Sequence, residues 1–107
     1  MKSAFDQDAN ARGAAEIFNL LANPTRVQIL ALLCGGERTP TQLGETLHAR
    51  PSVVSQQLRI LRLRDMVVAE RRGAYLHYRL ARPEIRDLIE CMQRCPLFEL
   101  PRRNPEP

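Results

Sequence analysis

The stretch from Arg50 to Arg64 combines helical spacing with side chains that could recognise a ligand. Pro51 is a helix-start signal. The apolar residues that follow recur on one side of a helix: Val54, Leu58 and Leu61. The opposite side is polar and carries Ser52, Ser55, Gln56 and Arg59. Short donors and acceptors of this kind suit the reading of base edges in a DNA major groove. A solvated helix face can have the same composition, so the rest of the chain must decide between the two interpretations.

Positive charge is concentrated on this stretch and the segment after it. The 107-residue chain has a net charge of +4, and 15 of its 16 basic residues are arginine. Residues 50–79 hold seven arginines and two acidic residues, a net charge of +5. Residues 1–49, with four basic and five acidic groups, carry −1, and residues 80–107, with five of each, carry zero. A localised basic patch on an otherwise neutral chain indicates a polyanionic partner.

Three helices are predicted ahead of the polar one. The first spans Asn10 to Ala22, and the second begins at Pro24 and ends at Gly35-Gly36. The second helix is apolar around much of its circumference, which predicts a central position in the core. The third spans Pro40 to Leu47, where Thr39 and Gln42 form a capping-box pattern. Residues 48–50 then lead into the polar helix at 51–64. Two short helices joined by a tight turn predict a helix-turn-helix.

A β-hairpin and a last helix complete the predicted fold. Val67 to Leu80 contains two β-rich runs around a turn at Arg72-Gly73. In the second run, Leu76, Tyr78 and Leu80 are expected inside and Tyr75, His77 and Arg79 outside. The last helix starts near Pro83, carries Cys95 at its end and is closed by Pro96. The fold class is therefore mainly α with a β-hairpin wing, a dimeric winged helix-turn-helix over residues 10–96, with a flexible stretch at 1–9 and a Pro/Arg-rich tail at 97–107.

The sequence also indicates which classes of protein to exclude. It has no run of 18 apolar residues and no apolar stretch near Met1 typical of a signal peptide, so we expect a cytoplasmic protein with no membrane partner. Its three cysteines are then expected to be thiols. Neither an acid nor a glycine-rich oxyanion loop accompanies Ser52, Ser55 and His77, so we do not expect an enzyme.

Three ordered motifs resemble the ArsR/SmtB family of bacterial repressors. Residues 21–30 (LANPTRVQIL) resemble the family's second helix, residues 51–58 with Leu61 its recognition helix, and residues 71–80 (RRGAYLHYRL) its wing. The resemblance covers about residues 15–95. It implies a homodimer, formed mostly by the first and last helices, that binds a palindromic double-stranded DNA operator and is released by an inducer.

The resemblance also implies roles for individual residues. Ser52, Ser55 and Gln56 correspond to the residues that read the groove, and Gln57 takes a position often held by histidine. Arg71 and Arg72 correspond to wing residues near the DNA backbone or minor groove. From their charge and position, the candidates to neutralise phosphates are Arg50, Arg59, Arg62, Arg71 and Arg72.

The inducer site is a separate question. The family's arsenite-type site has a Cys-x-Cys motif on the third helix, where this chain has Thr39 and Thr41. Its zinc-type site needs histidines that the last helix lacks. The remaining candidates for metal or thiol sensing are Cys34, Cys91 and Cys95. They could form a redox or persulfide switch, for which Cys34 and Cys95 resemble the family's pair by element, or bind As(III) or another soft metal. They could also be small buried hydrophobic residues.

We expect DNA binding itself to need no cofactor. The predicted function is a DNA-binding repressor that a cysteine-sensed signal releases from its operator. Two alternatives remain open at this stage. The same fold could dock an acidic protein partner through the 51–64 helix, or it could bind DNA without any inducer.

Overall fold

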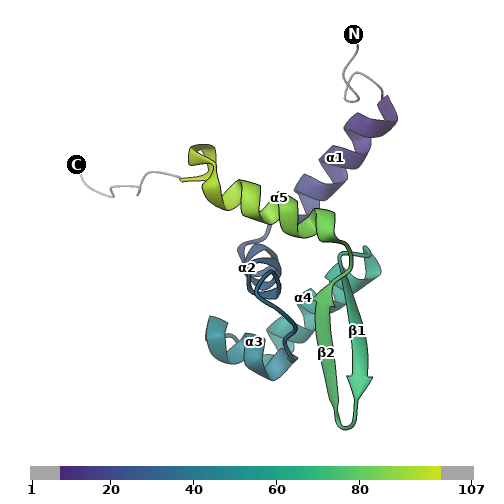
Figure 1. The fold of residues 1–107 in the computed structure, drawn as a ribbon, viewed down its shortest axis with the longest axis vertical. Coiled ribbons are helices and arrows are strands. Elements are labelled where there is room, and N and C mark those ends of the chain that lie inside the picture. The colour runs from purple at the N-terminus through teal and green to yellow at the C-terminus, as the bar shows by residue number, and fades with distance from the viewer. Residues whose placement is uncertain (1–7, 100–107) are drawn as a thin grey trace, which may run out of the picture.

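The computed structural model describes residues 8–99 and contains five α-helices and one hairpin (Figure 1). The elements follow in the order α1 (Asp8–Leu20), α2 (Pro24–Leu33), α3 (Pro40–Leu47), α4 (Pro51–Leu63), β1 (Val67–Arg72), β2 (Tyr75–Leu80) and α5 (Pro83–Arg94). A 3₁₀ turn, η2 (Pro96–Phe98), follows α5. This is the winged helix-turn-helix order that the sequence predicted.

The first helix is shifted relative to its prediction. It begins at Asp8 rather than Asn10, and the Asp8 carboxylate pairs with Arg12 one turn later at 3.0 Å. It ends at Leu20, because Asn23 caps α2 by accepting a hydrogen bond from the Arg26 amide. The flexible stretch expected at 1–9 and the tail expected at 97–107 lie mostly outside the described residues. Where they are described, residues 8 and 9 are helical and residues 97 and 98 belong to η2.

Local signals set the other helix ends. A proline occupies an early position in each of α2, α3, α4 and α5, where the missing amide hydrogen costs nothing. The predicted capping box of α3 is confirmed: the Thr39 side chain accepts from the Gln42 amide at 3.2 Å, and the Gln42 side chain accepts from the Thr39 amide at 2.9 Å. These caps fix where α3 starts and therefore where the helix-turn-helix begins.

The core is built around α2, as its apolar circumference predicted. Ile29, Leu30 and Leu33 of this helix are almost completely buried. They pack with residues from α3, α4, β1 and α5, among them Leu43, Leu58, Leu61, Val67 and Ile89. No polar or charged side chain among residues 8–99 is buried, so every ionic group considered below acts at the surface.

The turn between α3 and α4 depends on two backbone features. His48 takes a left-handed conformation, with φ 52° and ψ 43°, and its amide donates back to the end of α3. Gly44 is buried, and a Cβ atom there would lie 3.2 Å from the Ala49 carbonyl oxygen. A larger residue at 44 would push against the turn, so the small size of Gly44 allows α3 and α4 to approach closely.

The hairpin pairs Val67 with Leu80 at its base and Arg72 with Tyr75 at its tip, and Gly73 and Ala74 form the turn. Tyr78 is buried, in agreement with the predicted inward face. One pairing was not predicted. The Arg38 and Tyr78 backbones exchange two hydrogen bonds, of 3.1 and 2.9 Å, which joins the α2–α3 connection to β2.

The elements divide the molecule into two ends. In Figure 1, α3 and the hairpin tip lie at the lower end, and α1 and α5 lie at the upper end. The described fold is flat, with extents of 51 × 45 × 21 Å, and α1 projects from the rest along its length. Within residues 8–99 no helix has the length and apolar character needed to cross a membrane.

Candidate nucleic-acid interface

The polar face of α4 is open to solvent, as the sequence predicted. Its predicted base-reading residues Ser52, Ser55 and Gln56 are all exposed, while Val54 and Leu58 on the opposite side are fully buried. Arginines flank this face at both ends, and all are exposed: Arg50, Arg59, Arg62 and Arg64. Within residues 8–99, none of these four arginines forms an ion pair with another side chain. They are therefore available to an external anion.

Gln57 has a different environment from its neighbour Gln56. It is half-buried, and its Oε1 accepts a hydrogen bond of 2.9 Å from Arg26 Nη1. The same guanidinium donates through Nε to the Leu20 carbonyl oxygen at 2.6 Å. The sequence placed Gln57 among the DNA-binding residues. In the structure its carbonyl oxygen joins α4 to the junction between α1 and α2.

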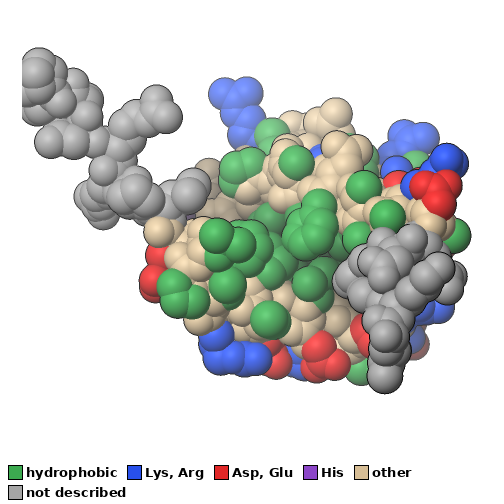
Figure 2. All heavy atoms as spheres, turned by 90° about the horizontal axis from the view of Figure 1, so that it is seen from above, with side chains coloured by type: hydrophobic (Ala, Val, Ile, Leu, Met, Phe, Trp, Pro, Cys, Tyr) green, Lys and Arg blue, Asp and Glu red, His purple; other side chains and the backbone are tan. Residues whose placement is uncertain are grey.

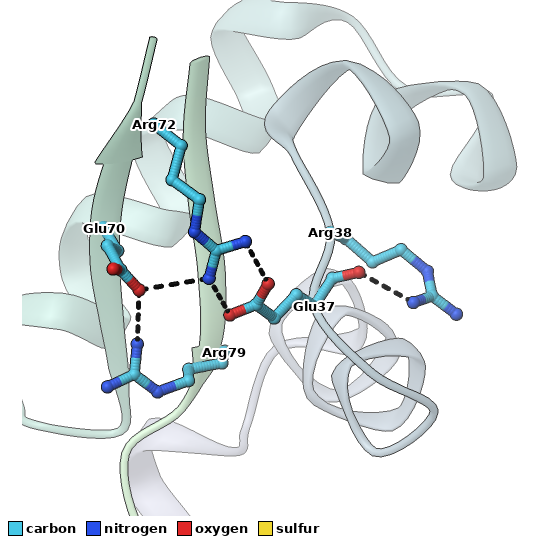
Figure 3. Close-up of polar contacts among 5 residues, drawn as sticks. All are labelled: Glu37, Arg38, Glu70, Arg72 and Arg79. Atoms are coloured by element: carbon cyan, nitrogen blue, oxygen red, sulfur yellow. Dashed lines mark hydrogen bonds and ion pairs between the residues drawn. The ribbon is translucent and has the colours of Figure 1, made fainter.

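The two predicted hairpin arginines, Arg71 and Arg72, have different surroundings. Arg72, a predicted phosphate ligand, makes a two-bond contact with the Glu37 carboxylate, at 2.8 Å from Nη1 to Oε1 and 2.7 Å from Nη2 to Oε2 (Figure 3). Arg72 Nη2 also lies 3.1 Å from Glu70 Oε1, which pairs with Arg79 Nη1 at 3.4 Å. We call Glu37, Glu70, Arg72 and Arg79 the wing-stem cluster.

The charges of the wing-stem cluster cancel. The hydrogen bonds from Arg72 hold the pKa of the Glu37 carboxyl below its usual range, and the two carboxylates raise the pKa of the Arg72 guanidinium. Two arginines and two glutamates sum to zero, so the cluster adds little to the basic patch. Arg71, which is exposed and unpaired within residues 8–99, remains as the hairpin arginine free to meet a phosphate.

The other end of the molecule has an apolar surface. Figure 2 shows hydrophobic side chains gathered on the face seen from above. The elements at this end carry exposed large hydrophobic side chains, Phe18 at 53% on α1, and Leu97 at 76% and Phe98 at 46% on η2. A shallow groove links Phe18 and Phe98 with Leu21, Val27 and Met92. Within residues 8–99, the Phe18 side chain on α1 is left half-exposed.

The three cysteines are free thiols in different surroundings. Cys91 is exposed on α5, and Cys95 is half-buried in a pocket beside Val27 and Ala31 of α2. Cys34 is half-buried at the other end of α2, where its carbonyl oxygen accepts a hydrogen bond from Arg86. Burial raises the pKa of the Cys34 thiol, with Arg86 opposing the effect and Glu90 adding to it. No three Cys, His, Asp or Glu side chains of residues 8–99 gather in a way that could hold a metal ion.

Sequence reasoning did not find Arg26 or Glu37. Each acts on a residue far along the chain, 31 positions away for Arg26 and Gln57 and 35 positions away for Glu37 and Arg72. Neither contact has a local pattern. The available hint was the position of Glu37 directly after Gly35-Gly36, where the chain leaves α2 and turns toward α3.

Comparisons with known proteins agree with this geometry. Residues 23–67 match the family described as bacterial regulatory protein, arsR family. The chain is 38% identical over 76 residues to the HTH-type transcriptional regulator Rv0081 of Mycobacterium tuberculosis, covering 70% of this chain and 67% of that protein. It is 30% identical over 76 residues to the transcriptional repressor SdpR of Bacillus subtilis, covering 71% and 84%.

The fold is similar to that of the homodimeric winged helix-turn-helix DNA-binding domain of Mb0332 from Mycobacterium bovis. The TM-score is 0.72 at 29% identity, with 86% of this chain and 84% of that chain covered. The matched relatives are transcriptional regulators rather than enzymes. The exposed face of α4, the hairpin beside it and these relatives lead to one assignment: the chain belongs to the ArsR family of winged helix-turn-helix, DNA-binding transcriptional repressors.

Proposed function

We propose that the protein is a homodimeric repressor that lays α4 of each protomer in a major groove of a palindromic operator. The observation that carries this proposal is the contrast between the two faces of α4. One face is fully buried in the core formed with α2, α3 and β1, and the other presents Ser52, Ser55 and Gln56 to solvent between arginines that are unpaired within residues 8–99. A row of small polar groups flanked by guanidinium groups matches base edges bordered by phosphates.

The exposed apolar surface at the α1–α5 end supports the homodimer. Phe18 is half-exposed on a helix that buries only Leu20, and α1 would gain cover from a second copy. This surface lies at the end of the molecule opposite α3 and the hairpin tip, so pairing there leaves the DNA-binding end free (Figures 1 and 2). Two recognition helices would then meet half-sites about 10 base pairs apart.

The test is a gel shift with DNA from upstream of the protein's own gene against random DNA of equal length. We expect a clear preference for the upstream fragment. If each protomer contacts ~3–4 phosphates, log K should fall with log salt with a slope of about −5 to −7 per dimer. Equal affinity for both fragments at every salt concentration would contradict sequence-specific binding and favour a module that docks a protein partner.

For the release signal, we propose that the cysteines sense it at the contact between α2 and α5, in a cytoplasmic, reducing environment. Cys34 and Cys95 both lie at this contact, toward opposite ends of α2. A group added to either thiol would displace α5 relative to α2. No three possible metal ligands gather within residues 8–99. A soft metal would therefore need thiols from both protomers, or would be held by fewer than three protein ligands.

Polysulfide and As(III) treatment distinguish the two classes of signal. Each is added to the protein–operator complex, with mass spectrometry to identify the modified thiols. We expect one of them to release wild-type protein, and a variant with all three cysteines changed to alanine to stay bound. Release of the cysteine-free variant by the same reagent would show that the cysteines are not the sensor. Failure of both reagents on the wild type would favour a DNA-binding module without thiol input.

A further inference from the structure

The wing-stem cluster connects the hairpin to a segment outside it. Glu70 and Arg72 lie on β1 and Arg79 on β2, whereas Glu37 lies on the connection between α2 and α3 (Figure 3). A two-stranded hairpin has little stability of its own, so its direction depends on what holds it to the body of the protein. Beyond the cluster, residues 73–75 at the hairpin tip are all exposed and have no such support.

Glu37 is well placed to hold the hairpin because its own backbone is fixed. The next residue, Arg38, exchanges two backbone hydrogen bonds with Tyr78 in β2. The Glu37 side chain is 31% exposed and that of Arg72 is 48% exposed, so both are partly covered by their neighbours. Two parallel bonds between a guanidinium and a carboxylate fix orientation as well as distance.

We propose that Glu37 is a positioning residue for DNA binding. It fixes the direction of the wing through Arg72, and Arg72 is a link between the hairpin and the α2–α3 connection rather than a phosphate ligand. This inference rests on the proposed function, since it assumes that the hairpin contacts DNA beside the groove that α4 reads. Among the hairpin arginines, Arg71 then carries the phosphate contact.

The alternative role of Arg72, as a phosphate ligand, predicts the opposite effect on DNA affinity when the Glu37 carboxylate is removed. If Arg72 binds phosphate, Glu37 competes with the DNA for it, and removing the carboxylate should strengthen binding. If Arg72 is a link, removing the carboxylate should release the wing and weaken binding. Loss of one negative charge also favours DNA binding in general, so a matched control is needed. Glu45, which is exposed on α3 and unpaired within residues 8–99, provides it.

The experiment measures operator affinity, its salt dependence and hydroxyl-radical protection for Glu37→Gln, Arg72→Ala, the double variant and Glu45→Gln in the full chain. We expect Glu37→Gln and Arg72→Ala each to bind the operator about two- to fivefold more weakly than wild type, the scale of an exposed ion pair. We expect both to lose protection at the outer flanks of the operator. The double variant should be no weaker than Arg72→Ala, and the salt slope of Arg72→Ala should equal that of wild type.

Two results would overturn the proposal. One is a salt slope for Arg72→Ala that is smaller by about 1.8 per dimer, the loss of one phosphate contact per protomer. The other is tighter operator binding by Glu37→Gln than by Glu45→Gln. NMR relaxation of the amides of residues 71–75 in the free protein tests positioning without DNA. Faster motion in Glu37→Gln supports the proposal, and unchanged motion contradicts it. Failure of the proposed function can be distinguished from failure of this inference, because the wild-type protein would then show no preference for the operator over random DNA.

Discussion

Gln56 and Gln57 are adjacent in α4 but have different partners. The amide of Gln56 is exposed, whereas Gln57 accepts a hydrogen bond from Arg26. A helix turns about 100° per residue, so neighbouring side chains can differ this much in environment. Gln57 holds α4 against the α1–α2 junction, whereas the exposed Gln56 is the candidate for base recognition in the proposed function.

We therefore expect opposite results from alanine at these two positions. Gln56→Ala should lose discrimination at one base pair, worth about 1–3 kcal/mol, with little change in stability. Gln57→Ala should lower the free energy of unfolding by about 1–2 kcal/mol, because it removes an acceptor from a charged donor. Binding to a set of single-base operator variants and urea unfolding measure the two effects. Equal loss of operator and random DNA binding in Gln56→Ala would remove it from the base-reading residues.

The pH dependence of the wing-stem cluster follows from the lowered pKa of Glu37. Its stabilising pairing with Arg72 is complete above the ordinary pKa of glutamate, about 4.3, and is lost only as the pH falls through the lower folded-state value. We expect NMR signals of the hairpin stem to stay constant from about pH 8 to pH 5. A transition of the Glu37 carboxyl at or above its ordinary pKa would contradict the ion pair.

At the scale of elements, short-range patterns predicted the fold well. Proline and capping-box signals fixed the starts of α3 and α4, and alternation fixed the inward face of β2. Contacts between partners that are distant in sequence were not predicted. The charge of Arg72 was visible, but its neutralisation by Glu37, 35 residues earlier, depends on tertiary packing. Residues 50–79 therefore offer fewer unpaired arginines to an anion than their composition indicated.

The turn between α3 and α4 contains a feature that the sequence did not reveal. His48 occupies a left-handed conformation usually taken by glycine. This conformation costs a residue with a Cβ atom roughly 1–2 kcal/mol, and glycine's greater freedom in the unfolded chain offsets about 0.5–1 kcal/mol of that. We expect His48→Gly to stabilise the protein by about 0.5–1 kcal/mol in urea unfolding. A His48→Gly variant less stable than the matched His48→Ala variant would contradict this account.

At the scale of the whole molecule, the apolar α1–α5 end and the DNA-binding end are far apart. We therefore expect that dimerisation and DNA contact can be disrupted by different substitutions. Phe18→Glu places a charge on the exposed apolar surface at the α1–α5 end, and we expect it to produce monomers and lose operator binding. Tyr75→Glu is the matched control, because Tyr75 is 64% exposed at the hairpin tip. It should remain a dimer and bind DNA more weakly. Analytical ultracentrifugation separates the two outcomes, and a dimeric Phe18→Glu variant would exclude this surface as the interface.

The extended shape of a single copy makes the stability of the fold depend on the concentration of the protein. The radius of gyration is 15.9 Å, against about 13 Å for a compact chain of 100 residues, so a single copy encloses a small core for its length. In the proposed homodimer, the second copy supplies the missing cover of α1. By mass action, the melting temperature should then rise with protein concentration. A cell that dilutes this repressor by growth would lower both its occupancy of the operator and its resistance to proteolysis.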